Sequence, residues 1–308
     1  MHVLEVSRVS KSFGSVQAVQ EVSFTANRGE VFTIIGPNGA GKTTTLEMIE
    51  GLQRPDSGAI SVLGMTWDRD AEKIKMRIGV QPQTSALFDL LTVEENLALF
   101  ASFYDRHRPV PEIMELINLT DHRRKMVKTL SGGQKQRLAI GLGLINDPEI
   151  IFLDEPTTGL DPQARRNIWD IVLKLREIGK TTVLTTHYME EAEQLSDRVC
   201  IIDQGRIIAM DTPRALVGRL TREREIQLKL ADDAEAAVSE GVARTEPNVT
   251  RVDRTGAHLR IRSGKPEATL YHLLGFASES GLTVEQISIR EMSLEDVFIA
   301  FTGKEWRD

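Results

Sequence analysis

A glycine-rich segment, GPNGAGKT, runs from Gly36 to Thr43. It follows an apolar run at residues 31–35, typical of a core strand, and precedes a helix-like stretch at 44–50. A strand, a GxxxxGK[ST] loop and a helix in this order form a phosphate-binding P-loop. Its backbone N–H groups close around phosphate oxygens, Lys42 reaches the β and γ phosphates, and the Thr43 hydroxyl binds Mg²⁺. Nucleotide contacts are therefore expected from Gly36, Pro37, Asn38, Gly39, Ala40, Gly41, Lys42, Thr43 and Thr44.

A second segment, IIFLDE at residues 150–155, is an apolar strand that ends in two carboxylates. Asp154 is placed to hold Mg²⁺, directly or through water, and Glu155 to accept a proton from the water that attacks the γ phosphate. The alternative is a strand that ends in solvated acids. The P-loop in the same chain favours the catalytic interpretation.

A third segment, LSGGQKQRLA at residues 130–139, begins with Ser131 and two glycines. This pattern predicts a helix N-terminus whose first backbone N–H groups are open to an anion. One chain would then carry two helix starts that face phosphate. The alternative for this segment is a capped surface helix.

These three motifs, in their order along the chain, make residues 1 to about 215 resemble the nucleotide-binding subunit of an ABC transporter. The resemblance implies an α/β fold: a P-loop NTPase domain of the ABC ATPase type with a β-rich subdomain and a helical insert. It also implies that ATP and Mg²⁺ are the cofactors and that ATP is hydrolysed.

Further roles follow from the resemblance alone. Phe13 matches the aromatic residue that stacks on adenine, although Tyr is commoner there. Gln83, in IGVQPQ, matches the glutamine that contacts Mg²⁺ or the attacking water, with Gln81 as a competitor. His187 matches the switch histidine that steadies the γ phosphate. The catalytic set is thus Glu155, His187 and Gln83, and the metal set is Thr43, Gln83 and Asp154.

The family's two subunits pack head to tail, so that the LSGGQ segment of one subunit covers the γ phosphate held by the P-loop of the other. The segment TGLD at residues 158–161 matches the loop that touches the opposite subunit. The resemblance therefore implies a homodimer that binds two ATP molecules between its subunits. Contacts with the partner's nucleotide are expected from Ser131, Gly132, Gly133, Gln134 and Asp161.

Charge and hydropathy limit the class of protein. The chain has 308 residues, and 38 Lys and Arg against 45 Asp and Glu give a formal charge of -7, so no nucleic-acid partner is expected. No apolar run reaches the roughly 18 residues that cross a bilayer, and the first residues show no signal peptide. We expect a cytoplasmic protein on the inner face of the cell membrane, bound to an integral membrane permease from a separate chain. The single cysteine, Cys200, is expected in a buried strand.

The apolar residues Leu87, Phe88, Leu90 and Leu91 suggest a permease-docking surface within 84–104, or else subdomain core. The ending SLEDVF at 293–298, in about 85 residues after the ATPase domain, is similar to exporters of the bacterial drug and antibiotic resistance branch. The interpretation is export of a drug, antibiotic, lipid or similar hydrophobic compound. Import, a translation or DNA-repair ABC ATPase, and a nucleotide-sensing regulator remain alternatives.

The elements that must position these motifs alternate between strands and helices. The patterns predict an ABC ATP-binding domain at 1–220, a linker at 221–225, and a small α+β domain at 221–308 for dimer support or regulation. Gly141 and Gly143, inside a predicted helix, suggest close packing. Strands are expected at 3–9, 21–26, 31–35, 58–62, 150–153, 182–186, 199–203, 226–230, 258–261 and 284–290. Helices are expected at 93–104, 111–119, 134–145, 231–239, 266–278 and 293–301.

Overall fold

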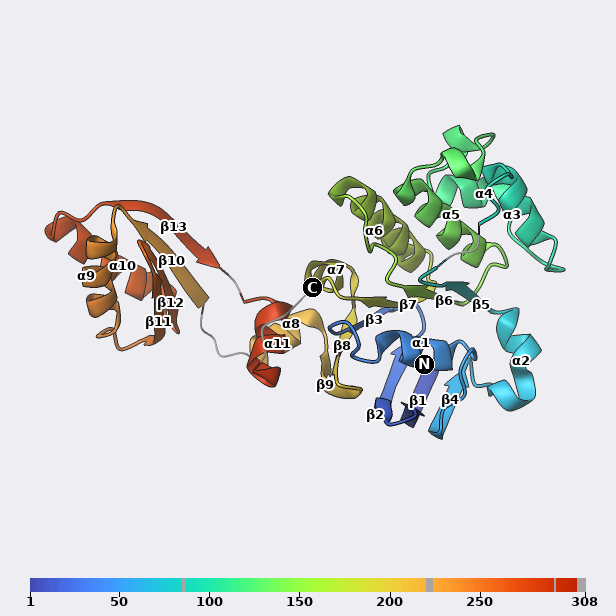
Figure 1. The fold of residues 1–308 in the computed structure, drawn as a ribbon, viewed down its shortest axis with the longest axis horizontal. Helices are drawn as coiled ribbons and strands as arrows, with labels where there is room; N and C mark the ends of the chain where they lie inside the picture. The colour runs from blue at the N-terminus through green and yellow to red at the C-terminus, as the bar shows by residue number, and fades with distance from the viewer. Residues whose placement is uncertain (85–86, 220–223, 291, 304–308) are drawn as a thin grey trace. The chain divides into compact units, whose positions relative to one another are not determined.

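The computed structural model describes residues 1–84, 87–219, 224–290 and 292–303. Contacts divide the chain into two units, one spanning Met1–Pro213 and a second that begins at Arg214 (Figure 1). The predicted domain boundary at residue 220 and the first three residues of the predicted linker lie outside the described residues.

The first unit is built on a six-stranded sheet in the order β5-β6-β7-β3-β8-β9. The strands from β5 to β8 are parallel, and β9 is an antiparallel edge. Since β3, β6 and β7 are neighbours, the loops at their carboxyl ends meet, as ligand-binding loops do in such sheets. The bounds are β3 Val31–Ile35, β5 Ile78–Gln81, β6 Ile150–Asp154, β7 Thr181–Thr186, β8 Arg198–Asp203 and β9 Arg206–Asp211.

One face of this sheet shares a core with a three-stranded antiparallel sheet, β2-β1-β4. Helix α1 lies between the two sheets and contacts both (Figure 1). The residues Phe32, Phe152 and Val183 face this core, whereas their neighbours along each strand face the opposite core. This arrangement confirms the predicted β-rich subdomain. The bounds are β1 His2–Phe13, β2 Val16–Asn27, β4 Ser57–Val62, α1 Lys42–Ile49 and α2 Trp67–Lys75.

The other face of the six-stranded sheet is covered by helices, which confirms the helical insert between strands (Figure 1). The predicted helices at 93–104, 111–119 and 134–145 are present with slightly different ends. Two short 3-10 turns, Thr120–His122 and Val127–Thr129, lead into α5. The bounds are α3 Val93–Ala101, α4 Val110–Leu116, α5 Gly132–Leu144, α6 Pro162–Glu177 and α7 Met189–Leu195.

The two glycines inside α5 lie where a side chain would collide with a neighbouring element. A Cβ on Gly143 would come 3.0 Å from the carbonyl oxygen of Val80 in β5. A Cβ on Gly141 would come 2.7 Å from Cδ1 of Ile117, beyond the end of α4. The close packing predicted for these glycines is confirmed, and it brings α5 directly against the central sheet.

The second unit is an antiparallel sheet in the order β11-β12-β10-β13, with α9 and α10 packed on one face. This arrangement confirms the predicted small α+β domain. The sequence did not predict β11 because Val252 is its only fully buried residue. The bounds are α8 Pro213–Arg219, β10 Arg224–Leu230, α9 Asp233–Ala243, β11 Val249–Thr255, β12 His258–Ser263, α10 Pro266–Glu279, β13 Val284–Arg290 and α11 Leu294–Thr302.

Candidate active site

The P-loop connects β3 to α1 and closes around the side chain of its own lysine. Gly41 caps α1 with φ of 99°, and a Cβ there would lie 2.3 Å from the carbonyl oxygen of Ala18, so only glycine fits. Lys42 is buried, and its Nζ donates to the carbonyl oxygens of Gly36 at 2.9 Å and Pro37 at 3.3 Å. Two backbone carbonyls thus hold the ammonium at the mouth of the loop.

Asp154 ends β6 beside the start of α1. Its Oδ1 accepts hydrogen bonds from the hydroxyls of Thr185, at 2.5 Å, and Thr43, at 3.4 Å. Burial raises the pKa of Asp154, and the nearby carboxylate of Glu155 adds to this rise, although both hydroxyls and Lys42 oppose it. The structure therefore places one buried carboxylate and one threonine hydroxyl together at the base of the P-loop.

The carboxylate of Glu155 lies beside Lys42, Thr158 and His187. Its Oε1 lies 3.2 Å from Nζ of Lys42, and its Oε2 accepts from the Thr158 hydroxyl at 3.1 Å. Nδ1 of His187 lies 3.2 Å from the same Oε2, without hydrogen-bond geometry. Burial alone would raise the pKa of Glu155, but Lys42, His187 and Thr158 together hold it below its ordinary value.

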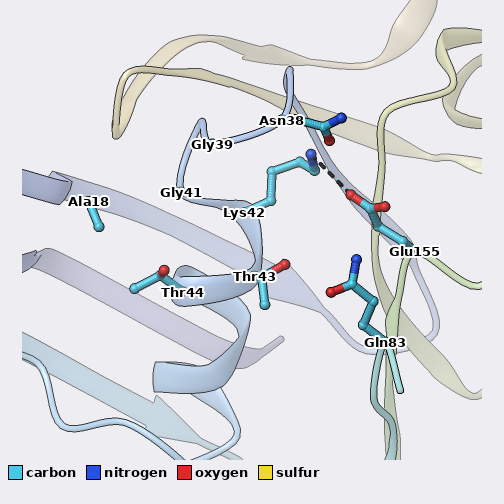
Figure 2. A pocket seen from close by; sticks show the side chains of 9 residues that line it. All are labelled: Ala18, Asn38, Gly39, Gly41, Lys42, Thr43, Thr44, Gln83 and Glu155. Carbon is cyan, nitrogen blue, oxygen red and sulfur yellow. Dashed lines mark ion pairs between the residues drawn. The ribbon is translucent and has the colours of Figure 1, made fainter. Parts of the chain in front are cut away.

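The backbone of Glu155 adopts φ of 45°, in the left-handed region that a non-glycine residue enters only at a cost. The backbone N–H of Glu155 is held in this conformation by the Thr185 hydroxyl at 3.0 Å. Strain of this kind gathers at functional sites, where the surrounding structure fixes it. Here it turns the carboxylate of Glu155 toward Lys42 (Figure 2).

A cavity of about 350 Å³ opens between the P-loop and these carboxylates (Figure 2). Gln83 reaches into it from the segment after β5, whereas Gln81 is fully buried and donates to the carbonyl oxygen of Pro82 at 2.6 Å. The cavity thus receives Gln83 and not its competitor. The lining residues are Ala18, Asn38, Gly39, Gly41, Lys42, Thr43, Thr44, Gln83 and Glu155.

The LSGGQ segment lines no part of this cavity. Ser131 is exposed and caps α5, with its hydroxyl accepting from the backbone N–H of Gln134. The Gln134 side chain accepts from the Ser131 N–H at 2.9 Å, and its Nε2 lies 2.7 Å from Nε2 of His122. A Cβ on Gly133 would lie 2.7 Å from Cβ of Ala164, so this helix start packs against α6. Gly132 is exposed as the first residue of α5.

Other predicted nucleotide contacts also lie outside the cavity lining: Phe13, Asp161 and the loop residues Gly36, Pro37 and Ala40. Phe13 ends β1 with its ring half exposed and Nζ of Lys11 5.6 Å from the ring centroid. Asp161 caps α6, accepting from the Ala164 N–H at 2.8 Å. The loop residue Ala40 is buried.

Sequence reasoning missed Thr185, whose hydroxyl donates to the Asp154 carboxylate and accepts from the backbone N–H of Glu155. It pairs with Asp154 in the register between β6 and β7. The signal was available, because a threonine pair directly precedes His187 and ends a strand parallel to the one that ends at Asp154. Two residues paired in register on neighbouring strands, such as Asp154 and Thr185, point to the same face of the sheet.

Comparisons with known proteins agree on one family. A protein-family profile described as "ABC transporter" matches residues 19–158. The linearmycin resistance ATP-binding protein LnrL of Bacillus subtilis is 36% identical over 311 residues, which cover 99% of this chain and 100% of that protein. The chain belongs to the ABC transporter ATP-binding proteins. It is an ABC transporter ATPase, as the motifs indicated.

Other relatives of this ABC transporter ATPase extend the match. The Nod factor export ATP-binding protein I of Sinorhizobium fredii is 39% identical, covering 99% of this chain and 87% of that protein. A profile described as "ATP-binding protein DrrA1-3-like, C-terminal domain" matches residues 219–302. Among solved structures, an ATP-binding subunit of an ABC transporter has a TM-score of 0.64 at 30% identity, covering 71% of this chain and 93% of its own.

A second solved structure is described as a dimeric bacterial ABC transporter cassette. It has a TM-score of 0.61 at 28% identity and covers 68% of this chain and 98% of its own. These comparisons confirm the predicted family and fold and the ATPase activity. No helix within the described ranges of this chain is long and apolar enough to span a bilayer.

Proposed function

We propose that two copies of this chain bind two ATP molecules between them and hydrolyse them to drive export through a separate permease. The observation that supports sharing is the lining of the cavity, which includes the P-loop, Gln83 and Glu155 but, among the described residues, none from LSGGQ. The N-terminus of α5, which Ser131 caps, is instead exposed and carries about half a positive charge. A second copy would supply this missing anion contact, together with Gly132, Gly133, Gln134 and Asp161.

Mg²⁺ fits the residues at the base of the P-loop. A site of one carboxylate and one hydroxyl beside substrate phosphates is the arrangement that this ion favours. Asp154 and Thr43 provide such a pair. Gln83 lines the same cavity as Thr43 (Figure 2). When bound, the ion would neutralise charge on the phosphates during hydrolysis. Burial disfavours the charged form of Asp154 and so raises its pKa, and a bound cation would offset this effect.

The contacts of Lys42 suggest how binding prepares the base. Its ammonium pairs with Glu155 and lowers the pKa of that carboxylate. The γ phosphate would draw Lys42 away, so Glu155 would lose its main cationic neighbour and become a stronger base toward the attacking water. His187, whose Nδ1 lies 3.2 Å from Glu155, would contact the same phosphate. Binding would thereby activate the catalytic carboxylate.

Coupling to transport requires a membrane protein that docks on the helical insert. Phe88 and Leu90 are 50% and 73% exposed, which favours docking over a core role for these two. Leu87 packs partly against the helical core and Leu91 is half-buried. Residues 85–86 of the predicted docking segment lie outside the described residues. We place the protein on the inner face of the cell membrane, bound there through its permease.

Export is favoured over import because the relatives carry the names of linearmycin resistance and Nod factor export proteins. We therefore propose a hydrophobic or amphipathic cargo, such as a drug, antibiotic or lipid. The same relatives weigh against a role in translation or DNA repair. We assign the ATP-binding domain to 1–220 and an accessory domain for dimer support or regulation to 221–308, where the DrrA-like profile also matches.

A mixing experiment tests the shared sites. Lys42→Ala removes the P-loop contact, and Ser131→Arg blocks the LSGGQ contact. Each variant alone is expected to show no ATP-dependent dimer in sedimentation velocity and little ATPase activity. The mixed variants should form heterodimers with one intact site, because one chain keeps its P-loop and the other its LSGGQ helix. If mixing restored neither dimerisation nor activity, composite sites would be excluded.

A further inference from the structure

Glu191 is a fully buried carboxylate outside the active site. It lies in α7, four residues after His187, with no measurable exposure. Its Oε2 accepts from the Thr157 hydroxyl at 3.1 Å, and its Oε1 accepts from Nε1 of Trp169 at 3.0 Å. The Thr186 hydroxyl, a third donor group, also favours the charged form of this carboxylate, although burial raises its pKa. Each of these three groups can donate a hydrogen bond to a carboxylate.

The three donors come from three separate elements that meet around the catalytic residues. Thr157 lies between Glu155 and the TGLD segment, which the proposed dimer places against the partner subunit. Thr186 is the last residue of β7 and precedes His187 directly. Trp169 belongs to α6, the helix that Asp161 caps at the end of TGLD.

A second contact joins α6 to the histidine segment. The guanidinium of Arg165 lies 4.0 Å from the ring centroid of Tyr188, and the Tyr188 ring centroid is 4.2 Å from that of His187. Arg165 also interacts electrostatically with Glu191. The histidine and the TGLD segment are thus connected through one buried cluster centred on Glu191.

We propose that Glu191 is a positioning residue for hydrolysis, linking the TGLD segment to His187. This inference rests on the proposed roles of His187 and Glu155. Movement of TGLD against the partner subunit is passed through Thr157 to Glu191, and from there to the end of β7 and His187. Glu191 itself is fully buried and is not among the residues that line the cavity. Its loss should therefore lower the rate of the chemical step and leave nucleotide binding intact.

Glu191→Gln tests this link at nearly constant volume. The amide keeps one oxygen for the Trp169 N–H but replaces the other oxygen by a donor, so the Thr157 hydroxyl must turn from donating to accepting and the link through Glu191 is altered. We expect kcat to fall about tenfold or more while KM for ATP changes less than about twofold, the pattern of a loss confined to the transition state. Glu190→Gln, on the exposed side of the same helix, is the matched control and should leave kcat unchanged.

Thr157→Val provides the second variant. It removes the TGLD link, keeps Glu191 and should give a smaller fall in kcat with the same unchanged KM. In the double variant, Thr157→Val should add no loss beyond that of Glu191→Gln, because both act on one link. Should Glu191→Gln fail to fold, Thr157→Val alone tests the proposal. A lower kcat with an unchanged KM supports it, and a normal kcat or an equal change in both overturns it.

Three results would overturn the proposal: normal kcat in Glu191→Gln, equal loss of kcat and ATP affinity, or independent additive losses in the double variant. The proposed base is tested separately. Glu155→Gln with full turnover would remove Glu155 from that role whatever the Glu191 variants show.

Discussion

The buried carboxyl group of Glu50 should make the stability of the first unit fall as the pH rises. Glu50 follows α1 directly, is 7% exposed, and its Oε1 is buried with no hydrogen-bond partner. Burial raises its pKa to about 8, and the charges of Asp154 and Glu47 add to the rise. At neutral pH the folded protein therefore keeps a proton on Glu50 that the unfolded chain releases.

The size of the effect follows from proton linkage. An exposed glutamate in the unfolded chain has a pKa of about 4.3, so both states are protonated at lower pH and the group contributes no difference there. Between that pH and about 8 the folded state binds one more proton, so stability is lost at up to about 1.4 kcal/mol per pH unit. From pH 6 to 7.5 the loss is about 2 kcal/mol. Glu50→Gln removes this loss, since the amide does not titrate.

The measurement is denaturant unfolding of wild type and Glu50→Gln at several pH values, without nucleotide or Mg²⁺. A Trp306→Phe background leaves Trp67 and Trp169 as fluorescent reporters, both in the unit that contains Glu50. The stability advantage of Glu50→Gln should grow by about 2 kcal/mol between pH 6 and 7.5. Glu72→Gln, an exposed control, should keep a constant difference from wild type. A constant difference for Glu50→Gln as well would refute the reasoning.

Three other variants and one reagent probe the account. Glu155→Gln should bind ATP with near-normal affinity in equilibrium titration and hydrolyse it about 10²- to 10⁴-fold more slowly, and undiminished turnover would remove the base. Gly143→Ala should destabilise the fold by about 1–3 kcal/mol in denaturant unfolding, and Gly79→Ala by more because its Cβ would lie 1.9 Å from the Gly143 carbonyl oxygen. Equal stability of the Gly79 variant would contradict that packing. Burial raises the pKa of Cys200 to about 12, so iodoacetamide at pH 8 should label it only after unfolding, and rapid labelling of the native protein would disprove its burial.

The motifs predicted the local parts of the site because each obeys a short-range rule. The P-loop follows from glycine spacing between a strand and a helix, and Asp154 follows from an apolar strand that ends in acids. The parallel order of β3, β6 and β7 then brings these parts together. The sequence also ranked Gln83 above Gln81, and the cavity receives Gln83.

Features that depend on contacts distant in sequence were not predicted. Thr185 reaches Asp154 across a strand pair, and Glu191 meets Thr157 across 34 residues. Glu50 looked like an ordinary polar end of a helix, yet tertiary packing buries it. Edge strands β9 and β11 were missed since their few buried residues give weak alternation.

Sedimentation velocity of Glu155→Gln with and without Mg²⁺ and ATP tests most directly whether two copies share the nucleotide. The account predicts a monomer without ATP and a dimer with it, and a return to monomer when Ser131→Arg is added to the same chain. A protein that binds ATP yet remains a monomer, or a dimer that Ser131→Arg leaves intact, would contradict it.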